Sequence, residues 1–148
     1  MGIDSNLLKD LRIWCINYAN SFLQKKACTD CLEVHSIALI AGWARCYFDD
    51  ADNISNHKDI DVDIYFAPRD EISGNFRKKI NTQSIPTIQY FNEMKVDLAR
   101  IVLIKPKSNN IHEDIRGYAR NRKTKRWLRK LGKPFVIIYP ILMPIKAL

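Results

Sequence analysis

An alternating run of acidic and apolar residues, from Asp59 to Phe66, is the feature that most constrains how this chain of 148 residues can fold. Its letters are DIDVDIYF, so an acid is followed by an apolar residue three times before the run becomes wholly apolar. Because successive side chains of a strand point to opposite faces, this period of two predicts a strand with three carboxylates on one face. The other face, with Ile60, Val62 and Ile64, is expected to pack against a core.

The three carboxylates of this strand, Asp59, Asp61 and Asp63, repel one another unless cations lie between them. Carboxylate oxygens two residues apart can both reach one or two Mg²⁺ or Mn²⁺ ions, which prefer oxygen ligands. A third ligand is expected from another strand, and Asp97 is the candidate because apolar residues flank it in the run MKVDLA. We therefore predict a metal site formed by Asp59, Asp61 and Asp97, with Asp63 in place of Asp59 if the register of the strand differs.

The other apolar patterns predict an α/β (α+β) fold, with a small mixed sheet flanked by helices. A chain of this length is expected to form one domain over residues 1–148. The expected helices cover 6–26, 43–48, 70–80 and 114–131. The expected strands cover 34–41, 59–66, 87–91, 95–104 and 135–139, with a turn around 92–93.

Positive charge is concentrated in the C-terminal part of the chain. Residues 1–104 carry 12 Lys and Arg against 14 Asp and Glu, whereas residues 105–148 carry 12 against 2 and end in an apolar segment. A basic helix of this kind favours a polyanionic partner, either RNA or DNA, although an acidic protein also fits. The residues expected to contact nucleic-acid phosphates are Arg116, Arg120, Arg122, Lys123, Lys125, Arg126, Arg129 and Lys130.

The order of motifs in residues 35–104 resembles a known superfamily. An apolar strand pattern ending at Ala41 is followed by Gly42, Trp43 and Ala44, then by the motif HKDID that begins at His57, and later by Asp97. The arrangement is similar to the nucleotidyltransferases related to DNA polymerase beta, which have a Gly-rich turn, a helix, an Asp-x-Asp strand and a later acid. The lincosamide and aminoglycoside nucleotidyltransferases, with Gly-Gly-Trp-Ala and His-x-Asp-x-Asp, are the most similar variant, and residues 1–104 look like a minimal core of this type.

The resemblance implies a metal-dependent enzyme that moves a nucleoside monophosphate from an NTP to a hydroxyl group. Asp59, Asp61 and Asp97 would be the catalytic residues and would hold Mg²⁺ or Mn²⁺. The nucleotide would be bound by Gly42, Trp43 and His57. The acceptor would be a nucleic acid or a side chain of a partner protein.

Two further functions fit the same residues. A nucleic-acid-binding module could keep the fold without turnover, because Ala41 stands where the family has the first glycine of the phosphate turn. Alternatively, a Mg²⁺-dependent nuclease could use Asp63 together with Glu93 and Lys95, which have the Glu-x-Lys form found in metal-dependent nucleases.

The sequence has no feature that predicts a membrane or secreted protein. No apolar run reaches the length of a spanning helix, and the first residues lack the pattern of a signal peptide. The spacing of the four cysteines does not suggest a disulfide framework, and Cys28, Cys31 and His35 give only part of a zinc-site spacing. We expect a cytoplasmic protein with reduced thiols and no membrane partner.

Overall fold

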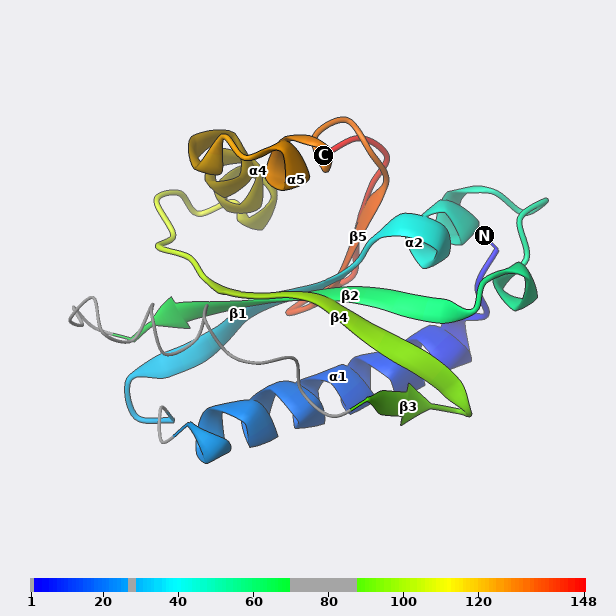
Figure 1. Cartoon of the computed structure of the whole chain (residues 1–148), viewed down its shortest axis with the longest axis horizontal. Coiled ribbons are helices and arrows are strands. Elements are labelled where there is room, and N and C mark those ends of the chain that lie inside the picture. Colours follow the sequence, from blue (N-terminus) through cyan, green and yellow to red (C-terminus); the bar gives the residue numbers. More distant parts are fainter. Residues whose placement is uncertain (1, 27–28, 70–87) are drawn as a thin grey trace.

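A six-stranded sheet forms the centre of the computed structural model, which describes residues 2–26, 29–69 and 88–148 (Figure 1). The order across the sheet is β3-β4-β2-β1-β5-β6, and only the β2–β4 pair is parallel within the described residues. The strands are β1 (Leu32–Leu39), β2 (Asp59–Pro68), β3 (Gln89–Phe91), β4 (Met94–Leu103), β5 (Phe135–Tyr139) and β6 (Met143–Ile145). The helices are α1 (Ser5–Lys25), α2 (Ala41–Phe48), α4 (Ile111–Arg122) and α5 (Lys125–Leu128), with a 3₁₀ turn over Ile54–Asn56.

Strand β2 is central, between β1 and β4, and its apolar face is buried as its alternation predicts. Ile60, Val62 and Ile64 have no exposed surface and belong to the core that α1 covers. Figure 1 shows α1 along this face of the sheet. The mixed α/β class and the strand at 59–66 are therefore confirmed.

Helix α1 begins directly after a capping residue, Asp4. A side-chain oxygen of Asp4 accepts the backbone N–H groups of Asn6 and Leu7 at 2.8 and 3.1 Å, which satisfies donors that have no partner inside the helix. Apolar residues then recur at helical spacing and form its buried stripe. That stripe consists of Leu8, Leu11, Cys15, Ala19, Phe22 and Leu23.

The opposite face of the sheet is covered by α4 and α5 (Figure 1). There Tyr65 of β2 and Val102 of β4 pack in one cluster with Ile115, Ala119 and Trp127. Because Asp59, Asp61 and Asp63 alternate with the residues that face α1, they lie on this second face of the sheet. The carboxylates and the basic segment therefore share one side of the sheet.

The basic segment is two helices, not the single helix predicted over 114–131. The chain leaves the helical conformation at Lys123, whose φ is 54°, and Thr124 then caps α5 by accepting the N–H of Trp127 at 3.4 Å. The sequence has no Gly or Pro at this break, so its helical pattern predicted one continuous helix.

The hairpin turn is confirmed at Asn92 and Glu93, whose φ values of 47° and 66° suit a tight turn between antiparallel strands. Strand β6 was not predicted, because Pro144 at its centre cannot donate to a ladder; the strand is tolerated at the sheet edge beside β5. The predicted helix over 70–80 lies outside the described residues. Among the helices that are described, none combines the length and apolarity needed to cross a bilayer.

Candidate active site

Asp61 and Asp97 lie side by side on neighbouring strands. The parallel register of β2 and β4 pairs Asp61 with Asp97, and the two carboxyl groups lie close enough for Asp97 to raise the pKa of Asp61. Burial, followed by the charges of Asp97, Asp59 and Asp63, raises the pKa of Asp61 to about 6. The pair is therefore a site of unfavourable negative charge.

Asp59 lies on the same face, one ladder step away, where the register pairs it with Lys95. The three carboxylates do not bring one oxygen each within 4.8 Å of the others. Among the described residues, only Cys46, Asp52 and His57 bring three ligand atoms that close. Asp59 and Asp61 are partly exposed and Asp97 is exposed, so solvent reaches all three. The predicted ligands are thus assembled as a close pair with a third carboxylate beside it.

The start of α2 lies next to this pair. The N–H of Ile40 donates to the carbonyl oxygen of Asp61 at 3.0 Å, which fixes the end of β1 and the first turn of α2 beside β2. No side chain caps α2, so its first N–H groups have no side-chain acceptor, and the start of a helix carries a partial positive charge. Ala41, the first residue of α2, has a φ of 54°, the left-handed conformation that glycine favours. The turn therefore keeps a glycine-like backbone although its first residue is alanine.

The three residues predicted to bind a nucleotide have different surroundings. Gly42 is buried under His57, because a Cβ at Gly42 would lie 2.4 Å from Nδ1 of the imidazole. Trp43 is 2% exposed in the core, and its Nε1 has no hydrogen-bond partner in the described structure. The position of Trp43 is that of a core residue, so a nucleotide contact is left to the backbone around Gly42.

Asp63 is not available as a metal ligand. The alternative in which Asp63 replaces Asp59 is therefore not supported. It is fully buried, and its Oδ2 accepts hydrogen bonds from Lys130 Nζ at 2.6 Å and from Tyr65 Oη at 2.9 Å. Burial raises the pKa of Asp63, while Lys130 and Tyr65 act in the opposite direction. The ammonium group of Lys130 is engaged in this ion pair, so it is not free to contact a phosphate group.

The nuclease residues are not brought together. Glu93 lies in the β3–β4 turn, and Lys95 stands opposite Asp59. Asp63 is four residues farther along β2, which is roughly 13 Å at the rise of a strand. The geometry does not assemble a nuclease site from Asp63, Glu93 and Lys95.

Six of the eight predicted phosphate contacts form an exposed basic surface on α4, on α5 and at their ends. Arg116 is partly buried and pairs with Glu113 at 3.6 Å, and Lys130 binds Asp63. Trp127 is buried, so it is a core residue and not a stacking platform. The basic surface consists of Arg120, Arg122, Lys123, Lys125, Arg126 and Arg129.

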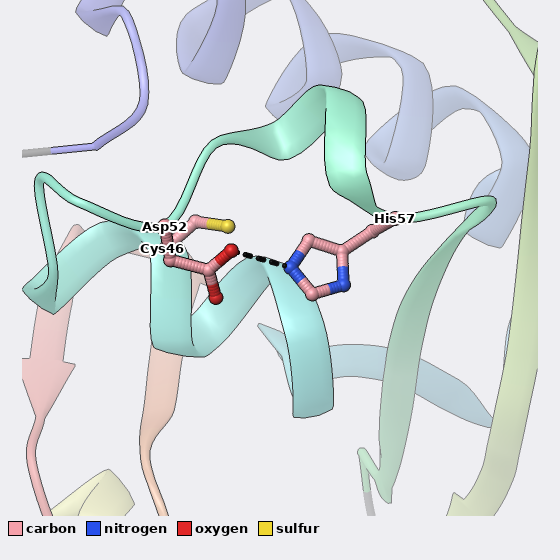
Figure 2. Close-up of side chains that lie close together, drawn as sticks. All are labelled: Cys46, Asp52 and His57. Carbon is pink, nitrogen blue, oxygen red and sulfur yellow. Dashed lines mark hydrogen bonds and ion pairs between the residues drawn. The ribbon is translucent and has the colours of Figure 1, made fainter.

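One cluster was missed by the sequence analysis: Cys46, Asp52 and His57 meet at α2 (Figure 2). The signal in the sequence was three potential ligands within twelve residues, without the paired spacing of zinc fingers. Burial and the nearby Asp52 carboxylate raise the pKa of Cys46 to about 11. Of the other partial zinc motif, His35 contacts Ser36 Oγ at 2.8 Å and Asp114 at 3.6 Å, and Cys28 lies outside the described residues.

Comparisons with known proteins add no family to these observations. No family model, curated protein or solved structure matches this chain. A functional assignment must therefore start from the side chains and backbone groups around Asp61.

Proposed function

We propose that this protein is a metal-dependent nucleotidyltransferase, which moves a nucleoside monophosphate from an NTP to a hydroxyl group. The observation that carries the proposal is the Asp61–Asp97 pair on adjacent strands beside the uncapped start of α2. The first turn of α2 offers donors for phosphate, and the carboxylates offer oxygen ligands for a cation. The order of these parts along the chain also resembles that of the DNA polymerase beta superfamily.

The donor set fits Mg²⁺ or Mn²⁺. Asp61 and Asp97 would hold the ion, with Asp59 on the same face, and all the donor atoms are carboxylate oxygens. The repulsion that raises the pKa of Asp61 marks a place where a cation is favourable. When bound, the ion would supply positive charge to the phosphate oxygens and would lower the pKa of the attacking hydroxyl.

Other groups of the chain would bind the triphosphate and accept the proton of the attacking hydroxyl. Backbone N–H groups around Gly42 would hold the triphosphate, because they lie at the positive end of α2. Asp97 is the exposed member of the pair, so an acceptor hydroxyl can approach it and give up its proton there. The new bond would join this oxygen to the α-phosphorus as pyrophosphate leaves.

A nucleic acid is the acceptor that the charges favour. The basic surface is carried by α4 and α5, which cover the same face of the sheet as Asp59 and Asp61 (Figure 1). A polyanion held on these helices would extend toward the carboxylate pair. A hydroxyl of a partner protein is the other acceptor class, and the assay below separates the two.

The first prediction concerns transfer itself. Label from an α-labelled NTP should appear on RNA in the presence of Mg²⁺ or Mn²⁺, and Asp61→Asn or Asp97→Asn should lower the rate by about 10³-fold. Asp10→Asn, an exposed change on α1 across the sheet, is the matched control and should keep the rate. Label on protein instead of RNA would change the acceptor. Bound but unlabelled RNA would indicate a binding module, and degraded RNA would indicate a nuclease.

The second prediction concerns the basic surface. The double variant Arg122→Glu/Arg126→Glu should bind single-stranded RNA at least about 10-fold more weakly, and its plot of log affinity against log salt should be shallower by about 1.4. Lys9→Glu/Lys25→Glu changes the same charge on α1, on the other face, and should leave the salt slope unchanged. An equal loss in both variants would mean that net charge alone governs binding.

A further inference from the structure

Three side chains of the types that bind transition metals meet beside α2 (Figure 2). Cys46 comes from α2 itself, Asp52 from the loop that follows, and His57 from the residue after the 3₁₀ turn. The sulfur, carboxylate oxygen and ring nitrogen that could bind an ion all lie within 4.8 Å of one another. None of the three belongs to the carboxylate set of the proposed transferase site.

The cluster is closed on one side and open on the other. Cys46 has no exposed surface, whereas the side chains of Asp52 and His57 are 24% and 20% exposed. His57 Nε2 lies 3.0 Å from Asp52 Oδ1, and the Cys46 sulfur lies within 4.8 Å of both groups. Gly42 leaves room for the imidazole ring, because any Cβ there would overlap it. The ring is thus seated with Nε2 directed at its neighbours in the cluster.

We propose that Cys46, Asp52 and His57 bind one Zn²⁺ ion, with water in the fourth position. A thiolate, an imidazole and a carboxylate form a donor set that zinc accepts in tetrahedral sites, and Mg²⁺ does not favour sulfur or nitrogen ligands. Three protein ligands with an open side leave one position for solvent. The thiolate and the carboxylate together balance the double charge of the ion.

The proton balance of binding is simple. The Cys46 thiol loses one proton to solvent as the Zn–S bond forms. Neutral His57 offers the lone pair of Nε2 and carries its proton on Nδ1. The hydrogen bond between His57 and Asp52 is replaced by bonds from both residues to the ion.

The ion would fasten the loop between α2 and β2. Cys46 and His57 bracket this loop, and His57 is two residues before Asp59 and packs on Gly42. Zinc at this point would hold the start of α2 and the start of β2 in their present relation. Its role would be to position these elements, and it would bind whether or not the chain transfers nucleotides.

The test is metal binding by the full, metal-free chain. Zinc competition with a chromophoric chelator should give one equivalent bound, and Co²⁺ should give the near-ultraviolet charge-transfer band of a cobalt–thiolate bond. His57→Gln and Asp52→Asn keep the buried thiol, and His57→Gln should weaken zinc by more than about 100-fold. Cys46→Ser should abolish the band. Zinc should also raise the melting temperature of the unmodified chain and leave that of His57→Gln unchanged.

Two controls make the assignment specific. Cys31→Ser removes a half-buried thiol of the partial CxxC motif, and Asp61→Asn alters the carboxylate pair; both should retain the full equivalent and the cobalt band. Loss of the band in Cys31→Ser but not in Cys46→Ser would overturn the proposal. Loss of zinc in Asp61→Asn alone, or no zinc bound by the unmodified chain, would overturn it as well. If Cys46→Ser does not fold, the two loop variants decide the outcome.

Discussion

Replacement of Lys130 by methionine should lower the free energy of unfolding by about 3–5 kcal/mol at neutral pH. The Lys130 ammonium lies 2.6 Å from Oδ2 of Asp63, and the Asp63 side chain has no exposed surface. Methionine keeps an apolar side chain of similar length, but it loses the ammonium group over the Trp127 ring and leaves the carboxylate buried without its cation. The remaining partner, the Tyr65 hydroxyl, is neutral and cannot offset that charge.

The defect in Lys130→Met should shrink as the pH falls. Burial already raises the pKa of Asp63, and the loss of Lys130 removes the main opposing influence. A carboxyl whose pKa is raised by folding stabilises the native state while it is protonated, and this advantage is lost as the pH rises through the folded value. The variant should therefore be nearest to the unmodified chain below the ordinary pKa of 3.8 and farthest from it at neutral pH.

The opposite single change provides the control. Asp63→Asn should cost less than Lys130→Met, because the lysine side chain is 13% exposed and can turn its ammonium group to solvent. The double variant should recover a large part of the loss, which urea denaturation of all four proteins would measure as a coupling energy. Equal costs for the two single changes, or additive costs in the double variant, would contradict the assignment of a buried ion pair.

This ion pair shows which part of the site could be predicted from local sequence. The alternation at 59–66 correctly places Asp59, Asp61 and Asp63 on one face of a strand, because side-chain direction in a strand depends only on its period. The fate of Asp63 depends instead on Lys130, which is 67 residues away in the chain. No local pattern distinguishes a carboxylate that faces solvent from one that meets a lysine of another element.

The Asp61–Asp97 pairing also depends partly on local sequence and partly on how distant elements pack. An acid among apolar residues marks Asp97 as a candidate ligand, but its register against β2 is a property of the sheet. The ladder slips by one residue after Val62, so that Arg100 and not Ala99 stands opposite Asp63. A bulge of this kind changes which side chains are neighbours without a mark in the sequence.

Asp61→Asn should have opposite effects on function and on stability. It should abolish most of the proposed transfer, and yet raise the free energy of unfolding by about 1–2 kcal/mol at neutral pH without divalent metal. The carboxyl of Asp61 has a pKa of about 6 in the folded chain, against an ordinary 3.8. Its ionisation therefore disfavours the folded state, and the full difference is reduced because Asp61 is partly exposed.

The pH dependence of the free energy of unfolding distinguishes relief of charge repulsion at Asp61 from a general gain in packing. A raised pKa contributes stability that is complete below about 3.8 and is lost as the pH rises through about 6. Asparagine carries no charge, so the advantage of Asp61→Asn should be absent near pH 4 and fully present above pH 7, while Asp10→Asn shows no such step. Melting curves across this pH range, with and without Mg²⁺, measure how stability depends on pH and on the ion.

Mg²⁺ should stabilise the unmodified chain more than the variant, because the ion relieves the repulsion that asparagine has already removed. A gain in the variant that is constant with pH would show that Asp61 is not held in a repulsive pair.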